Sequence, residues 1–178
     1  WLDFAIEKKA DFLAMDLADN ELAVGPEVFV PLFEKAKSEG FAVTIHAGEA
    51  AGPQASRNIR NSIEMLHADR IGHGVRILED PEVLEFVRER GTVLELCPTS
   101  NWLSGVCPTR EAHPFRDIMD AGIKTTVNTD DPGIMNISIM DEYRLLRDAM
   151  SFTDAELVQI NQWGRDASFL PEAKKAAV

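Results

Sequence analysis

Two residues that are costly to bury, His46 and Glu49, end the strand-like segment VTIHAGE at residues 43–49. A histidine nitrogen and a carboxylate oxygen are both suitable ligands for zinc, and a catalytic zinc site usually has three or more protein ligands. His46 and Asp130 can supply two of them. Glu49, three residues after His46, could place its carboxyl group near a metal-activated water and carry protons without binding the metal.

Two further polar residues follow the ends of strand-like segments. His73 could hydrogen-bond the same water or an oxyanion, and Asp131 stays free to meet a substrate. Taken singly, such residues have a simpler explanation, because strand-end histidines are often structural or solvated and the segment 130–133, DDPG, is a good turn sequence. His67, in a helical segment, and His113, just before a proline at a predicted helix start, are interpreted as structural.

The elements that must position these residues alternate along the chain. Period-two and apolar runs predict five strands, and helical spacing with capping residues predicts helices between and after them. The predicted strands are 12–18, 41–47, 68–74, 92–98 and 123–130, and the predicted helices are 26–40, 56–68, 79–91, 113–122, 138–150 and 153–163. This alternation indicates parallel β/α units, arranged as an open doubly wound sheet or as a closed eight-stranded barrel.

The positions of the polar residues favour the barrel. Five of them lie at or just beyond the C-terminal ends of successive predicted strands, where barrel enzymes carry their active sites: Asp16, His46, His73, Cys97 and Asp130. No glycine-rich phosphate loop follows the first strand. Five strands fall short of eight, and the chain opens on Trp1. We therefore predict one domain over residues 1–178, an incomplete (β/α)8 barrel of TIM type containing the last five β/α units and C-terminal helices of a longer polypeptide.

Composition narrows the possible partners. The 178 residues are 45% hydrophobic and carry a net charge of −12, which repels phosphate backbones and anionic membrane surfaces. No apolar run reaches the roughly 20 residues of a membrane span. Cys97 and Cys107 match no metal-binding spacing and are interpreted as free thiols. We expect a cytoplasmic protein that acts on a small molecule, with no nucleic-acid or membrane partner.

Four ordered motifs carry a resemblance. HAGE at 46–49, RIGHGV at 70–75, LCPTSN at 96–101 and VNTDDPG at 127–133 resemble the adenosine deaminase family of metal-dependent amidohydrolases. MDLADNE at 15–21 is similar to a further family segment, and SFLP at 168–171 to its helical tail. The resemblance extends from about residue 12 to the end of the chain. It implies hydrolytic deamination of adenosine and 2′-deoxyadenosine to inosine and ammonia, by attack of a zinc-activated water at C6.

The resemblance also implies a role for each matching residue. His46 matches a metal-binding histidine and Asp130 the metal-binding aspartate, and the family metal is usually zinc. Glu49 matches the residue that delivers a proton to purine N1. His73 matches the residue that orients and deprotonates the attacking water, and Asp131 matches the carboxylate that contacts this water and purine N7.

Two departures from the family pattern leave alternatives open. The family's His-x-His pair, which supplies two more metal ligands, is absent from residues 1–178, so we expect this chain alone to be inactive. Asp19 stands where the family has a glycine whose N–H contacts purine N3. The substrate could therefore be adenine or another 6-aminopurine. The chain could also be a non-catalytic half-barrel that dimerises through its open sheet edges or associates with an N-terminal segment.

Overall fold

Five parallel strands form a single sheet in the computed structural model, which describes residues 1–175. Each strand pairs with the next along the chain, as in a barrel, and the register places His46 opposite Gly72 and Ala47 opposite His73. The strands are β1 (Ala14–Leu17), β2 (Ala42–Ala47), β3 (Arg70–His73), β4 (Val93–Leu96) and β5 (Thr125–Val127). All five predicted strands are confirmed, with shorter bounds, and the sheet is a partial barrel.

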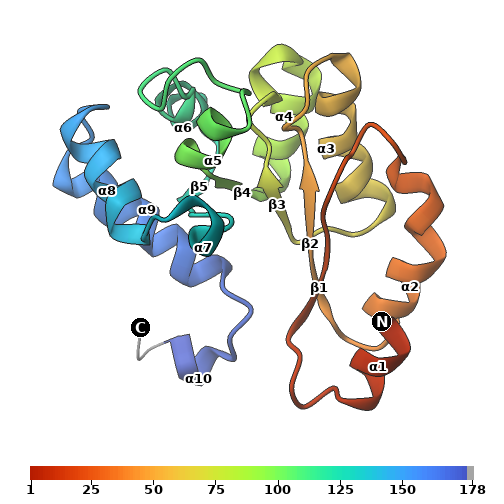
Figure 1. Ribbon diagram of the computed structural model, residues 1–178. Helices are drawn as coiled ribbons and strands as arrows, with labels where there is room; N and C mark the ends of the chain where they lie inside the picture. Colours follow the sequence, from red (N-terminus) through yellow and green to blue (C-terminus); the bar gives the residue numbers. More distant parts are fainter. Residues whose placement is uncertain (176–178) are drawn as a thin grey trace.

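Helices follow the strands and cover the outer face of the curved sheet (Figure 1). α2 and α3 pack on β2, while α6, α8 and α9 pack against β5. The helical elements are α1 (Leu2–Glu7), η1 (Pro26–Phe29), α2 (Val30–Ser38), α3 (Pro53–Met65), η2 (Ile77–Glu79), α4 (Pro81–Arg90), α5 (Pro98–Leu103), α6 (Phe115–Asp120), α7 (Pro132–Met135), α8 (Ile139–Asp148), α9 (Asp154–Ala167) and α10 (Glu172–Lys175). No helix described between residues 1 and 175 has the length and apolar character needed to cross a membrane.

Capping residues set several helix ends where the sequence predicts them. The Asp80 carboxylate accepts hydrogen bonds from the N–H groups of the first turn of α4, and Gly91 ends that helix with a left-handed φ of 68°. Thr153 and Glu156 form a capping box at the start of α9. The predicted helix over 56–68 needs correction: α3 begins at Pro53 and ends at Met65, and His67 is an exposed residue with a φ of 57°, outside the helix.

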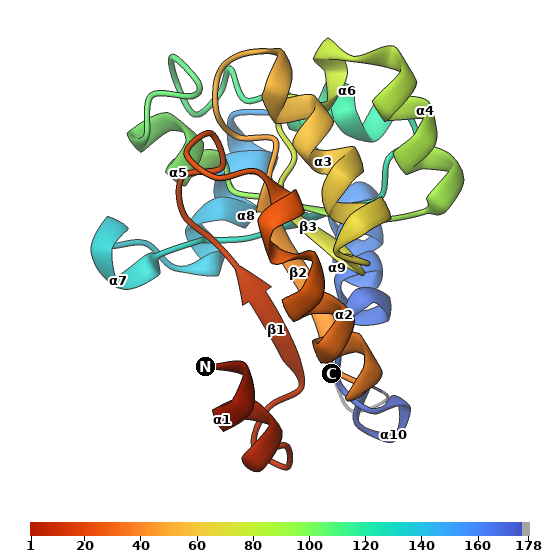
Figure 2. The same ribbon diagram turned by 90° about the vertical axis from the view of Figure 1, so that its right-hand side faces the viewer.

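Two faces of β2 have different surroundings. Val43, Ile45 and Ala47 are fully buried against the helices, while Thr44 and His46 alternate with them and are only half-buried. This second face is the inner face of the partial barrel, which Figure 2 shows open beside β1. Because a barrel needs eight strands, the five described here leave this inner face and the β1 edge without the cover that closure provides.

Candidate active site

One cavity of about 340 Å³ lies at the C-terminal ends of the strands. Its lining includes all five residues that the sequence places at strand ends, from all five strand–loop junctions: Asp16, His46, His73, Cys97 and Asp130. Parallel strands bring their C-terminal ends to the same edge, so residues up to 114 positions apart in the chain meet there. The predicted convergence at the barrel rim is thus observed.

The polar groups at this rim form a close cluster. The Nε2 atom of His46 lies 3.5 Å from Oε2 of Glu49, and Nδ1 of His73 lies 3.7 Å from Oε1 of Glu49. On its other side, Nε2 of His73 lies 3.9 Å from Oδ2 of Asp130. One donor atom from each of His46, Glu49 and His73 lies within 4.8 Å of the other two, a spacing that can hold a metal ion. Asp130 adjoins this trio through His73.

Two residues of this rim have left-handed backbone conformations. His73 and Asp130 adopt left-handed φ values of 64° and 60°, which cost a non-glycine residue about 1–2 kcal/mol. Such strain persists only where the surrounding structure fixes it, and it is common at functional sites. Gly48 has a φ of 77°, and a Cβ there would lie 2.5 Å from Cδ1 of Ile59. Gly48 is therefore required by packing as well as by the turn.

Glu21, in the loop after β1, holds the turn that carries Glu49. Its carboxylate accepts hydrogen bonds from the backbone N–H groups of Gly48, Glu49 and Ala50 at 2.9, 2.7 and 2.8 Å. The side chain of Asn58, on α3, donates to the same carboxylate at 3.0 Å. The sequence contains Glu21 within MDLADNE, but no local pattern predicts this role, because the contact joins residues 27 to 37 positions apart.

The side chain of Glu49 is also held by a residue of α5, which in turn contacts the segment before α6. Asn101, fully buried, donates through Nδ2 to Oε1 of Glu49 at 2.7 Å, and its Nδ2 also lies 3.2 Å from Nδ1 of His73. Its Oδ1 lies 2.9 Å from Nε2 of His113. The structural interpretation of His113 holds in that it is buried, yet its contact with Asn101 ties it to the candidate site.

Burial sets the protonation state of the groups around the cavity. The pKa of His73 is lowered, chiefly by burial and against the opposing effect of the Glu49 carboxylate, which favours the neutral imidazole that binds metals and accepts protons. Burial lowers the pKa of His113 to about 3. Burial also raises the pKa of the Cys97 thiol well above its usual range, so Cys97 remains a thiol. The hydroxyl of Ser100 donates to Oδ2 of Asp130 at 2.7 Å.

The two residues assigned to substrate contacts lie outside this cavity lining. Asp19 is exposed, has a φ of 103° in the range that favours glycine, and borders a neighbouring hollow of about 270 Å³ that His46 also lines. Its carboxylate accepts a hydrogen bond from the N–H of Asn20 at 2.7 Å. Asp131 is exposed and is the N-cap residue of α7, with its carbonyl accepting from Met135.

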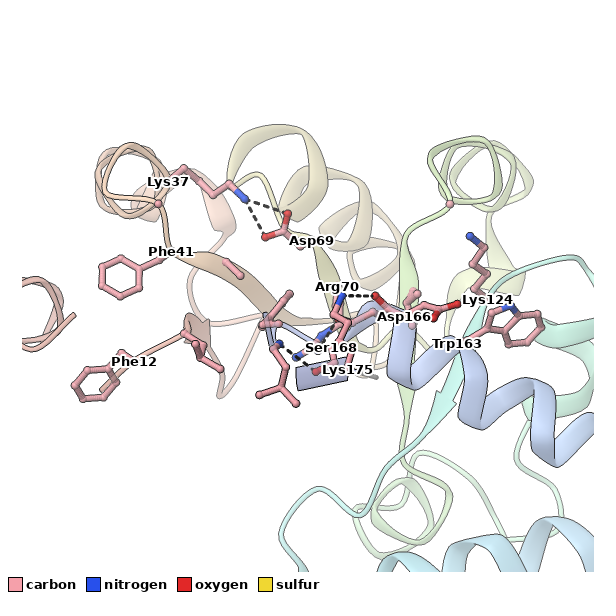
Figure 3. A pocket seen from close by; sticks show the side chains of 18 of the residues that line it. Phe12, Lys37, Phe41, Asp69, Arg70, Lys124, Trp163, Asp166, Ser168 and Lys175 are labelled. Atoms are coloured by element: carbon pink, nitrogen blue, oxygen red, sulfur yellow. Dashed lines mark hydrogen bonds and ion pairs between the residues drawn. The ribbon is translucent and has the colours of Figure 1, made fainter. Parts of the chain in front are cut away.

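A larger hollow of about 910 Å³ lies at the opposite, N-terminal ends of the strands (Figure 3). The guanidinium of Arg70 stacks 3.7 Å from the ring centroid of Phe169, and Lys37 pairs with Asp69 at 2.9 Å. Its lining contains no histidine or cysteine among the described residues. These cations are engaged by neighbouring protein groups, so the chemistry-bearing cluster at the other end of the sheet is the candidate active site.

The parallel sheet, with its polar residues at the C-terminal ends of the strands, defines part of a TIM-type barrel. A family model described as adenosine deaminase matches residues 3–178, and the chain belongs to the adenosine deaminase family. Among curated relatives, adenosine deaminases from Shewanella denitrificans and Plasmodium falciparum are 38% and 36% identical over 177 residues. These matches cover 99% of this chain and 53% and 48% of the relatives. The chain thus spans about half the length of these relatives and corresponds to their C-terminal half.

Solved structures have the same fold. An adenine deaminase from Arthrobacter aurescens superposes with a TM-score of 0.92 at 27% identity, covering 99% of this chain and 53% of its own. An amidohydrolase from Burkholderia ambifaria, solved with bound Zn, gives a TM-score of 0.88 at 33% identity and covers 99% and 49%. An N6-methyl-AMP deaminase from Arabidopsis thaliana, at 24% identity and a TM-score of 0.86, supports the fold alone.

Proposed function

We propose that this chain forms the C-terminal half of an enzyme that hydrolyses adenosine and 2′-deoxyadenosine to inosine and ammonia. The observation that carries the proposal is the meeting of His46, His73 and Asp130 around one strand-end cavity, with the Glu49 carboxylate 3.5 and 3.7 Å from the two imidazoles. Curated relatives named adenosine deaminase support the same chemistry. The net charge of −12 fits a cytoplasmic enzyme with a small nucleoside substrate rather than a polyanionic partner. Below, "full-length protein" means the polypeptide that contains this chain as its C-terminal half.

The donor groups fit zinc as part of a larger ligand set. Imidazole nitrogens and carboxylate oxygens are its usual ligands, and the buried, neutral state of His73 keeps the neighbourhood free of a competing imidazolium. In the proposal His46 and Asp130 hold the ion, and ligands outside residues 1–178 complete its shell. When bound, zinc supplies an acidified water at neutral pH.

The remaining polar residues bind, orient and move protons. Glu49 is held by Asn101 and by the Glu21-bound turn, so its carboxyl group has a fixed position from which to protonate a purine ring nitrogen. This protonation matters because the aromatic C6 is otherwise a poor electrophile. His73, neutral and 3.9 Å from Asp130, is placed to orient the attacking water and to take its proton. Asp131 is assigned to substrate from the exposed start of α7.

A second substrate, free adenine, is favoured by one observation at Asp19. This residue has a φ of 103°, which suits the turn that the family glycine would make, and it adds a carboxylate to the lining of the neighbouring hollow. The structure with a TM-score of 0.92 is an adenine deaminase. Comparing turnover of adenosine and adenine in the full-length protein, with Asp19→Gly as the variant, decides between the two substrates.

The test of the proposed site uses Glu49→Gln in the full-length protein, with Glu64→Gln on the exposed surface of α3 as the matched control. We expect Glu49→Gln to lower the rate of the adenosine-to-inosine absorbance change by about 10²–10⁴-fold while zinc content stays unchanged. Glu64→Gln should leave both unchanged. Full activity in Glu49→Gln would contradict the proton-carrying role. Loss of zinc instead would show that Glu49 is a ligand within the His46–Glu49–His73 trio.

A further inference from the structure

Asn101 occupies a position between the two groups that the proposed mechanism uses to move protons. It is fully buried on α5, and its Nδ2 lies 2.7 Å from Oε1 of Glu49 and 3.2 Å from Nδ1 of His73. Its other side-chain atom, Oδ1, lies 2.9 Å from Nε2 of the buried His113. One amide thus joins a carboxylate and two imidazoles.

The amide of Asn101 has a defined orientation. Its NH₂ group faces Oε1 of Glu49, and its oxygen faces Nε2 of His113. The oxygen only accepts hydrogen bonds, which places the proton of His113 on Nε2. The remaining nitrogen of His113, Nδ1, has no hydrogen-bond partner among the described residues. With the proton on Nε2, this unpaired nitrogen is an acceptor, so the ring leaves no buried N–H group without a partner.

The same NH₂ group fixes the tautomer of His73. Because an amide nitrogen donates and never accepts, Nδ1 of His73 must present its lone pair to Asn101. A neutral His73 therefore carries its proton on Nε2, the nitrogen that lies 3.9 Å from Oδ2 of Asp130. In this arrangement the imidazole presents an N–H to the cavity.

We propose that Asn101 is a positioning residue that fixes the Nε2–H tautomer of His73 and the orientation of the Glu49 carboxylate, with His113 holding the amide in place. The inference rests on the proposed function for the roles of Glu49 and His73. It deepens that function, because His73 enters the reaction as a hydrogen-bond donor that orients an oxygen at the cavity. Nε2 can take the proton of the water only in the other tautomer, in which its own proton has moved to Nδ1, and this requires the Asn101 amide to release Nδ1.

The test is a long-range ¹H–¹⁵N correlation spectrum, which reports the tautomer of each neutral histidine. It is recorded without metal at about pH 8, above the ordinary histidine pKa of about 6.5, on the 178-residue chain and on the full-length protein. We expect the Nε2–H form for both His73 and His113. The Nδ1–H form of His73 in the wild-type protein overturns the inference, whatever the variants do.

The sharpest variant is Asn101→Asp, which keeps an acceptor toward His113 and replaces the NH₂ group by an acceptor. We expect His73 to change to the Nδ1–H form in this variant, because Nδ1 then faces an acceptor. Ser62→Ala, which removes a buried hydroxyl on α3 that has no hydrogen-bond partner among the described residues, serves as the control and should keep the wild-type tautomers. An unchanged His73 tautomer in folded Asn101→Asp would overturn the inference.

The spectrum separates this inference from the proposed function. Wild-type tautomers as expected, in a full-length protein that leaves adenosine unchanged, would support the positioning role and reject the deaminase activity. Turnover of adenosine in a protein whose His73 carries the proton on Nδ1 would support the deaminase activity and reject the positioning role of Asn101.

Discussion

At the scale of single residues, the turn HAGE shows how packing fixes a residue type beside a polar site. A Cβ on Gly48 would lie 2.5 Å from Cδ1 of Ile59 and 3.0 Å from Cα of Gly74, so an alanine there must displace a buried side chain and the backbone. Gly105 has the same φ of 77° with nothing within 4 Å of the corresponding Cβ position. Comparing alanine variants at Gly48 and Gly105 therefore separates the cost of backbone strain from the cost of overpacking.

We predict that Gly48→Ala lowers the free energy of unfolding by about 1–3 kcal/mol more than Gly105→Ala does. Both variants bear the cost of a left-handed non-glycine residue, about 1–2 kcal/mol, and only Gly48→Ala adds the clash with Ile59. Urea unfolding measures both values. Equal losses in the two variants would show that Ile59 and Gly74 can move aside at no cost.

The burial of His113 leads to a second prediction for a single residue, on how the free energy of unfolding depends on pH. The pKa of His113 is about 3 in the folded protein, below its ordinary value of about 6.5, so between these values the unfolded chain binds the proton. The contribution of neutral His113 to the stability of the folded state is present above about pH 6.5 and is lost as the pH falls toward 3. At about pH 5 the loss is about 2 kcal/mol relative to neutral pH.

The variant His113→Gln should remove this part of the pH dependence of unfolding, because a glutamine amide can still donate to Asn101 but does not titrate. His67→Gln is the matched control, since His67 is exposed, and it should retain the wild-type slope. Free energies of unfolding in urea at about pH 5 and pH 7.5 give the comparison. Wild type and His113→Gln with the same slope would contradict the burial of a neutral imidazole.

At the scale of elements, the loop after β1 positions the turn after β2. A glutamine at position 21 replaces one carboxylate oxygen by a donor that would face the N–H of Gly48 or the N–H groups of Glu49 and Ala50. We predict that Glu21→Gln lowers the free energy of unfolding by about 1–3 kcal/mol and speeds hydrogen exchange at residues 48–50. Glu34→Gln, exposed on α2, is the control and should change neither. Unchanged protection of these three amides would refute the role of Glu21.

How far the sequence predicts these elements depends on whether the signal is local. The strands and α4 and α9 follow from periodicity and from caps such as Asp80 and Thr153, which act within a few residues. The short helices α5 and α7 begin at Pro98 and Pro132, soon after β4 and β5 end, and each is too short to show a helical period. They appear only in the structure.

The candidate site divides in the same way. His46, His73 and Asp130 are predictable because each lies at or just beyond the C-terminal end of a strand, and parallel strands bring those ends together. Glu21 and Asn101 are not, because their contacts with Gly48, Glu49 and His73 span 27 or more positions and neither residue occupies a strand end. Supporting hydrogen bonds of this kind depend on the packing of whole elements, which local spacing does not encode.

At the scale of the whole molecule, the sheet has five strands, three fewer than a closed (β/α)8 barrel. Among residues 1–175, β1 pairs only with β2 and β5 only with β4, so the sheet has two edges whose backbone groups lack strand partners. Large apolar side chains are exposed near one edge, including Leu13, which is 51% exposed. A barrel of eight strands would have no such edges.

We predict that the 178-residue chain alone has no measurable adenosine deaminase activity, with or without added zinc. His46 and Asp130 give two ligands where a catalytic zinc site usually has three or more, and the open inner face cannot exclude water from the cavity. The absorbance change from adenosine to inosine measures turnover, and the full-length protein under the same conditions is the control. Turnover by the isolated chain would contradict the need for further ligands.

The open edges lead to a linked expectation about assembly, since unpaired parallel strands associate with other strands when they can. The isolated chain should self-associate with rising concentration in sedimentation experiments, and the full-length protein should not do so through these edges. If the chain instead forms one stable dimer that binds zinc and remains inactive, the non-catalytic half-barrel explains it better than an enzyme fragment. A monomer at all concentrations would mean that the edges of β1 and β5 are protected within this chain, and the requirement for a second half would then rest on the missing metal ligands alone.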